Sequence, residues 1–202
     1  MASTSRFLRV CRLACLGAFA LLIAGCATLT SSPLTPPARD SLDAFSLEGR
    51  FSLRNEDKNY SGRLSWQHQG ADNQLLLSSP FGQGMAEITT TTGWARLTTS
   101  DGKRYEAADS ETLTQQVLGY ALPLTLLTDW VRGRGNAAGS SEQDAHGRPL
   151  RLRHEDWRIE YAYDNDEAQA PPSLIIAERA GGLQLRLKIE EWNSRVPAEG
   201  AP

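Results

Sequence analysis

Short segments in which apolar and polar residues alternate recur along most of this chain, and they constrain its fold more than any other feature. In the clearest segment, Leu183, Leu185, Leu187 and Ile189 are separated by polar or charged side chains. Such alternation is typical of a β-strand that buries one face. The pattern predicts strands over residues 45–54, 60–67, 74–78, 85–91, 94–99, 103–106, 150–154, 157–163, 174–178 and 183–192. About ten short strands in this order predict one curved antiparallel sheet or an open barrel.

The apolar period changes from two residues to that of a helix between residues 109 and 133. Asp109 or Ser110 can cap a helix that stops at Gly119, and Pro123 can open a second helix that ends at Gly133. The apolar stripes of the two helices consist of Leu113, Val117 and Leu118, and of Leu124, Leu127, Trp130 and Val131. We expect both stripes to cover the concave face of the sheet. The predicted fold class is therefore mainly β with a helical lid, and the glycine-rich residues 133–147 are predicted to form a surface loop.

The N-terminus reads as a targeting segment. Arg6, Arg9 and Arg12 precede an uncharged run of thirteen residues, 13–25, which is too short to span a bilayer at about 20 residues per helix. This run ends with small residues directly before Cys26, as in the lipobox of bacterial lipoproteins, where the cysteine is acylated and becomes the new N-terminus. The alternative is a plain secretory signal in which Cys26 is incidental.

Cysteine usage favours the lipobox. Cys11 and Cys15 lie within the segment to be removed, so Cys26 is the only cysteine of the mature chain. Acylation removes a stray thiol from an oxidising compartment, and two or three acyl chains anchor a protein stably. Ala27 follows, whereas in the enterobacterial pattern an Asp at this place retains lipoproteins in the inner membrane. We therefore expect an anchor in the outer membrane, facing the periplasm.

These features divide the chain into four parts. Residues 1–25 are predicted to be a lipoprotein signal peptide, and residues 26–40 the lipidated cysteine with a Ser/Thr/Pro-rich tether. Residues 41–195 form the predicted folded domain, which we expect to be a monomer, and residues 196–202 are a C-terminal tail.

Charge and motifs exclude several classes of function. The chain has 21 Lys and Arg against 24 Asp and Glu, and three of the arginines lie in the leader, so nucleic acid is not an expected partner. His68, His146 and His154 show no metal-ligand spacing such as HExxH, and no serine lies in a G-x-S-x-G motif. We therefore predict a binding protein without enzymatic activity, metal or other cofactor.

A concave sheet without catalytic groups can offer an apolar cavity. Large apolar residues on the predicted strands and helices are the candidates to line it: Phe51, Leu64, Trp66, Leu75, Leu77, Ile88, Leu97, Leu118, Trp130, Ile159 and Leu187. The pattern alone does not distinguish such a cavity from a solid core made of the same residues.

One turn breaks the usual rule for surface loops. Pro80, Phe81 and Gly82 place a large apolar ring where the chain reverses direction. The ring can fold back on the core, or it can stay exposed for contact with a membrane or an apolar cargo.

The assembled pattern resembles the LolB family of outer-membrane lipoproteins over about residues 20–193. Six segments carry the resemblance in the family's order: the lipobox at Cys26, Phe45-x-Leu47-x-Gly49-Arg50, LLLSSPFG at 75–82, Gly119-x3-Pro123-x2-Leu126-x3-Trp130-x2-Gly133, Trp157-x-Ile159-x-Tyr161, and PPSLIIAERAGGLQLRLKIEEW near the end. Each segment is weak alone, but the six in order are specific.

The resemblance implies both a fold and a function. The fold is an open antiparallel β-barrel of about ten to eleven strands with a helical lid around an apolar cavity, like that of LolA and LolB. The function is that of a receptor that accepts acylated lipoproteins from the periplasmic carrier LolA and inserts them into the inner leaflet of the outer membrane. The family's protruding apolar loop corresponds to Pro80, Phe81 and Gly82. The alternative function is a structural or assembly lipoprotein with a solid core and no lipid cavity.

Overall fold

The computed structural model describes residues 36–55, 58–134 and 141–194. These residues form a 3-10 turn η1 (Arg39–Ser41), eleven strands and two α-helices, and the helices are α2 (Ser110–Leu118) and α3 (Leu124–Val131). The strands are β1 (Ala44–Arg54), β2 (Asn59–Gln69), β3 (Asp72–Ser78), β4 (Gly84–Thr91), β5 (Trp94–Thr99), β6 (Arg104–Ala107), β7 (Ser141–Gln143), β8 (Pro149–His154), β9 (Trp157–Ala162), β10 (Leu174–Arg179) and β11 (Leu183–Asn193).

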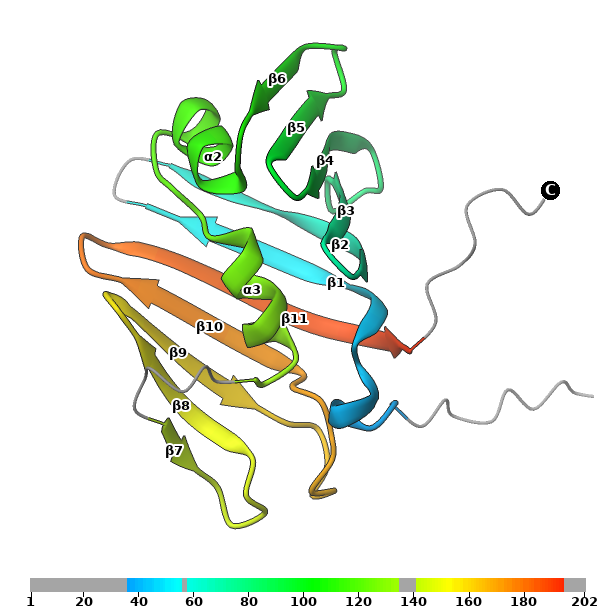
Figure 1. Cartoon of the computed structure of the whole chain (residues 1–202), viewed down its shortest axis with the longest axis vertical. Helices are drawn as coiled ribbons and strands as arrows, with labels where there is room; N and C mark the ends of the chain where they lie inside the picture. The colour runs from blue at the N-terminus through cyan, green and yellow to red at the C-terminus, as the bar shows by residue number, and fades with distance from the viewer. Residues whose placement is uncertain (1–35, 56–57, 135–140, 195–202) are drawn as a thin grey trace, which may run out of the picture. The chain divides into compact units, whose positions relative to one another are not determined.

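All eleven strands belong to one antiparallel sheet with the order β6-β5-β4-β3-β2-β1-β11-β10-β9-β8-β7. Pairing between β1 and β11 joins two runs of sequential strands. The edge strands β6 and β7 lie at opposite ends of the domain in Figure 1, so the curved sheet does not close. The predicted open antiparallel barrel with a helical lid is confirmed.

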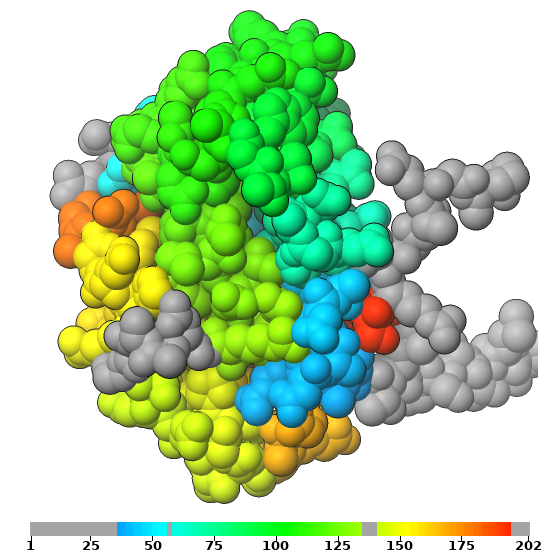
Figure 2. Space-filling view, viewed as in Figure 1, coloured from blue at the N-terminus to red at the C-terminus, as the bar shows by residue number. Residues whose placement is uncertain are grey.

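The two helices lie on the same side of the sheet, where they cover its strands (Figures 1 and 2). The Asp109 side chain accepts a hydrogen bond from the Thr112 amide at 2.6 Å and so caps α2. Gly119 ends α2 with φ +93°, a left-handed conformation that favours glycine. Both ends of α2 therefore lie where the sequence places them. Within the described residues, neither helix is long and apolar enough to cross a membrane.

A register shift lies at the end of β11, where Glu48 of β1 pairs with Glu191 but Gly49 pairs with Ile189. Glu190 is the extra residue of this β-bulge. Glu190 and Glu191 are both exposed, and Trp192 after them is buried. In a regular strand the adjacent Glu190 and Glu191 would point to opposite faces of the sheet, but the bulge leaves both exposed.

The predicted surface loop over residues 133–147 contains a strand that the sequence pattern does not predict. Ser141–Gln143 forms β7, which pairs with β8, and all three of its residues are exposed. A three-residue edge strand with no buried side chain shows no apolar alternation, so only its pairing reveals it.

Candidate functional site

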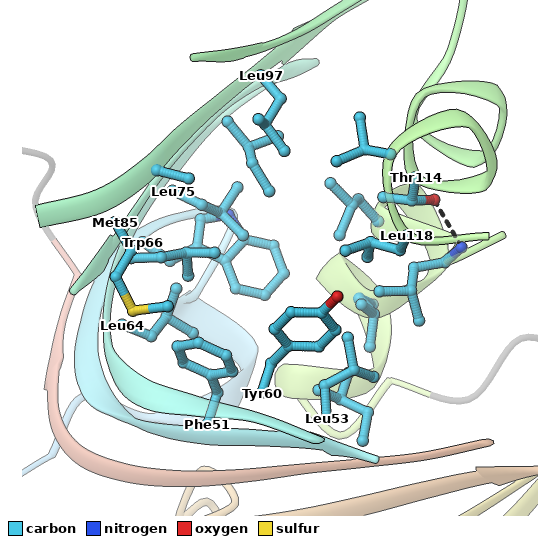
Figure 3. A pocket seen from close by; sticks show the side chains of 18 of the residues that line it. Phe51, Leu53, Tyr60, Leu64, Trp66, Leu75, Met85, Leu97, Thr114 and Leu118 are labelled. Carbon is cyan, nitrogen blue, oxygen red and sulfur yellow. Dashed lines mark hydrogen bonds between the residues drawn. The ribbon is translucent and has the colours of Figure 1, made fainter. Parts of the chain in front are cut away.

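The concave side of the sheet and the two helices enclose a cavity of about 270 Å³. Side chains reach it from β1 to β5 and β11 on one side and from the helices and their connection on the other, as Figure 3 shows for the labelled residues. The lining residues are Phe51, Leu53, Tyr60, Leu64, Trp66, Leu75, Leu77, Met85, Ala86, Ile88, Leu97, Thr99, Thr114, Val117, Leu118, Leu122, Leu124, Leu127, Leu185 and Leu187. The walls are almost wholly hydrocarbon.

The structure brings most of the candidate lining residues together. Those around the cavity are Phe51, Leu64, Trp66, Leu75, Leu77, Ile88, Leu97, Leu118 and Leu187. Trp130 and Ile159 are buried but lie outside it, so their assignment to the cavity is wrong. Trp130 packs on Trp157 of β9, with 5.5 Å between ring centroids. In this part of the sheet, aromatic rings therefore pack against one another.

Several lining residues are absent from the predicted set although their spacing in the sequence indicates an inward-facing position. Leu53 and Leu185 have the same alternation as the candidates beside them, and Val117, Leu124 and Leu127 belong to the predicted helical stripes. The signal was sufficient to place these residues on the inner face. It did not say which part of that face is hollow.

The main polar group in the cavity wall on the helix side is internally satisfied. Thr114 donates its hydroxyl hydrogen bond to the Ser110 carbonyl at 2.8 Å and accepts one from the Leu122 amide at 2.8 Å, the bond dashed in Figure 3. A buried hydroxyl whose bonds are made within the protein offers little to a polar ligand. With few polar groups in its wall, the cavity is suited to hydrocarbon, which it contacts mainly by dispersion.

Phe81 stands out on the surface of the domain, with 95% of the residue exposed. It lies between β3 and β4 in a tight turn, in which the Gly82 amide donates to the Ser79 carbonyl at 2.9 Å. Pro80 precedes Phe81, and Gly82 has φ +84°, so the chain reverses without drawing the ring inward. Folding of the ring back onto the core, the alternative left open by the sequence, does not occur.

The three histidines occupy separate places. His68 is buried, and its Nδ1 lies 3.0 Å from Asn73 Oδ1. His154 is buried against Trp130, and exposed His146 lies 3.8 Å from an Asp166 carboxylate oxygen. Cys26, the signal peptide and the C-terminal tail lie outside the described residues.

The fold and the site define a class of protein: an open β-sheet that holds an apolar cavity beneath two short helices and presents one exposed aromatic residue in a turn. Residues 43–192 match the family model described as "Outer membrane lipoprotein LolB". The chain belongs to the LolB family.

Two relatives agree with this assignment in their sequences. The chain is 42% identical over 176 residues to the outer-membrane lipoprotein LolB of Dechloromonas aromatica, covering 85% of this chain and 92% of that protein. It is 35% identical to the LolB of Thiobacillus denitrificans, covering 91% and 98%. Among solved structures, a LolA superfamily protein from Nitrosomonas europaea matches 76% of this chain and 87% of its own, with a TM-score of 0.49 and 14% identity.

Proposed function

We propose that this chain is an outer-membrane lipoprotein receptor that takes acylated lipoproteins from the periplasmic carrier LolA and inserts them into the outer membrane. The observation that carries the proposal is the apolar cavity of about 270 Å³ beneath the helices. Membership of the LolB family and the names of its relatives support the same role. The mature protein acts by binding and not by catalysis, as a monomer anchored through acylated Cys26 and facing the periplasm.

The need for such a cavity follows from the cost of exposing acyl chains to water. Burying hydrocarbon contributes about 0.8 kcal/mol per CH₂, so a chain of about 16 carbons costs on the order of 13 kcal/mol to expose. The cavity keeps the chains from water while the cargo moves from carrier to membrane. Dispersion contacts have no direction, so one cavity accepts many lipoproteins.

Phe81 supplies the second part of the proposal. A fully exposed aromatic ring on a lipid-anchored protein is suited to entering the acyl region of the nearby leaflet. We assign Pro80, Phe81 and Gly82 to delivery and the cavity to capture. The two steps then use different parts of the molecule.

The alternative, a structural lipoprotein with a solid core, is disfavoured by the cavity itself. Uptake of a fluorescent fatty acid by the purified mature chain separates the two functions. In cells, depletion of the protein should leave lipoproteins on the carrier. No uptake of the probe and no accumulation on the carrier would contradict the proposal.

The anchor has a direct test of its own. Mass spectrometry of the mature N-terminus should find an acylated Cys26 and no residue before it. An unacylated terminus at another position would refute the anchor without affecting the cavity.

A further inference from the structure

The inner face of β2, β3 and β4 changes from apolar to polar at one level of the strands. At one end of these strands, Ser78 of β3 pairs with Arg63 of β2, and the turn that carries Phe81 follows. Along β2 from this end, the residues on the inner face of the sheet are Leu64, Trp66 and His68. Leu64 and Trp66 line the apolar cavity, and His68 does not.

The neighbouring strands change at the same level. Trp66 pairs with Leu75, which pairs with Ile88, and all three line the apolar cavity. One step further, His68 pairs with Asn73 and Asn73 with Thr90. These last three residues line a different, polar pocket of about 480 Å³ that shares no lining residue with the apolar cavity.

A hydrogen bond joins the two levels. Trp66 Nε1 donates to Asn73 Oδ1 at 3.0 Å, and Asn73 Nδ2 donates to Thr90 Oγ1 at 3.1 Å. An indole nitrogen can only donate, so this bond fixes which end of the Asn73 amide faces Trp66. Asn73 Oδ1 also lies 3.0 Å from His68 Nδ1, which must therefore carry the proton between them.

The indole of Trp66 is held on a second side by packing. The Phe45 ring of β1 lies edge-on to it, with centroids 5.6 Å apart and planes inclined by 70°. Trp66 is 1% exposed and Phe45 is fully buried. A large ring that is packed on one side and hydrogen-bonded on another has one orientation.

We infer that Trp66, positioned by Asn73, is the floor of the acyl cavity and sets the longest acyl chain that the cavity encloses. The inference rests on the proposed function, since it takes acyl chains to be the ligand. Beyond Trp66 a chain meets amide, imidazole and hydroxyl groups that already bond one another. Methylene groups displace such bonds at a cost and gain no burial, so further chain length adds no affinity.

The test is a chain-length series measured on the mature chain with Cys26→Ser, which keeps every described residue. Saturated fatty acids of about 10 to about 20 carbons compete with a fluorescent fatty acid, and affinity should rise about fourfold per CH₂ until the chain reaches the floor. Trp66→Leu should move this break toward longer chains by about two carbons. Trp130→Leu is the matched control, because Trp130 is buried outside the cavity, and its break should stay in place.

A second variant works in the opposite direction if Trp66→Leu fails to fold. Ile88→Phe adds bulk at the level of Trp66 and should move the break to shorter chains by about two carbons. A break that stays fixed in a folded Trp66→Leu or Ile88→Phe variant, or that moves equally in Trp130→Leu, would overturn the inference alone. No binding by the unchanged protein would overturn the proposed function as well.

Discussion

Replacing Phe81 by Glu tests whether the protein delivers its cargo with a different part of the molecule from the part that captures it. Only a twentieth of Phe81 is buried. With about 200 Å² for a whole Phe and about 25 cal/mol per Å², the ring contributes roughly 0.25 kcal/mol to folding. The free energy of unfolding of Phe81→Glu should therefore stay within about 0.5 kcal/mol of that of the unchanged protein.

Delivery should suffer far more than stability. A carboxylate costs about 3 kcal/mol to bring into the acyl region, where Phe is mildly favourable. This difference predicts a fall in the delivery rate on the order of 100-fold. Uptake from the carrier should be unchanged, because the ring does not line the cavity.

The assay uses purified carrier loaded with an acylated lipoprotein, this protein and liposomes, and it measures the cargo on each over time. Phe81→Glu should hold the cargo and fail to release it, and Phe81→Leu should deliver normally because it keeps an apolar tip. Circular dichroism of both variants checks folding. Normal delivery by Phe81→Glu would show that the turn has no insertion role, and loss of folding would show that the ring packs in solution.

Three further experiments test separate parts of the structure. Leu75→Asp should abolish fatty-acid uptake and Leu76→Asp should retain it, because Leu75 lines the cavity and adjacent Leu76 is 46% exposed on the outer face. Equal loss of uptake in both variants would contradict the assignment of Leu75 and Leu76 to opposite faces of β3. Gly62→Ala should lower the free energy of unfolding by about 1–3 kcal/mol, since its Cβ would lie 2.0 Å from a backbone carbonyl oxygen of β3. Gly84→Ala is the control, because its Cβ would meet nothing within 4 Å, and equal denaturation midpoints for the two variants would refute the close approach. Burial lowers the pKa of His68 in the folded protein, so the unfolded chain binds this proton first as the pH falls below about 6.5, and the free energy of unfolding declines until the pH reaches the folded pKa. Denaturation at several pH values should show a smaller decline for His68→Gln. An identical decline would exclude His68 as its source.

The fold was largely predictable because its two periods are strong in the sequence. Leu183, Leu185, Leu187 and Ile189 are all buried, as the alternation predicts. Helix α2 is capped by Asp109 and ends at Gly119, which are the residue types that favour the two ends of a helix. The bulge at Glu190 was not predictable in this way, because an added residue is visible only against the partner strand.

The sequence predicts which residues of the site face inward, but it does not predict where the cavity between them lies. Alternation assigns Leu64 and Ile159 equally to an inner face, yet Leu64 lines the cavity and Ile159 is buried outside it. The difference depends on which strands the helices cover and on which rings they insert, as Trp130 does beside Trp157. The polar level beyond Trp66 likewise depends on how the strands pair, since His68 and Asn73 lie opposite each other only when β2 and β3 pair as they do.

We propose that the cavity beneath the helices holds the acyl chains of the cargo. The most direct measurement uses a lipoprotein whose acyl chains carry a photoreactive group, transferred from the carrier to this protein, crosslinked and mapped by peptide mass spectrometry. We expect crosslinks to cavity residues such as Leu64, Leu75 and Leu118 and none to exposed Leu76 or Leu150. Crosslinks confined to the outer face of the sheet, with the cavity residues unmodified, would contradict this proposal.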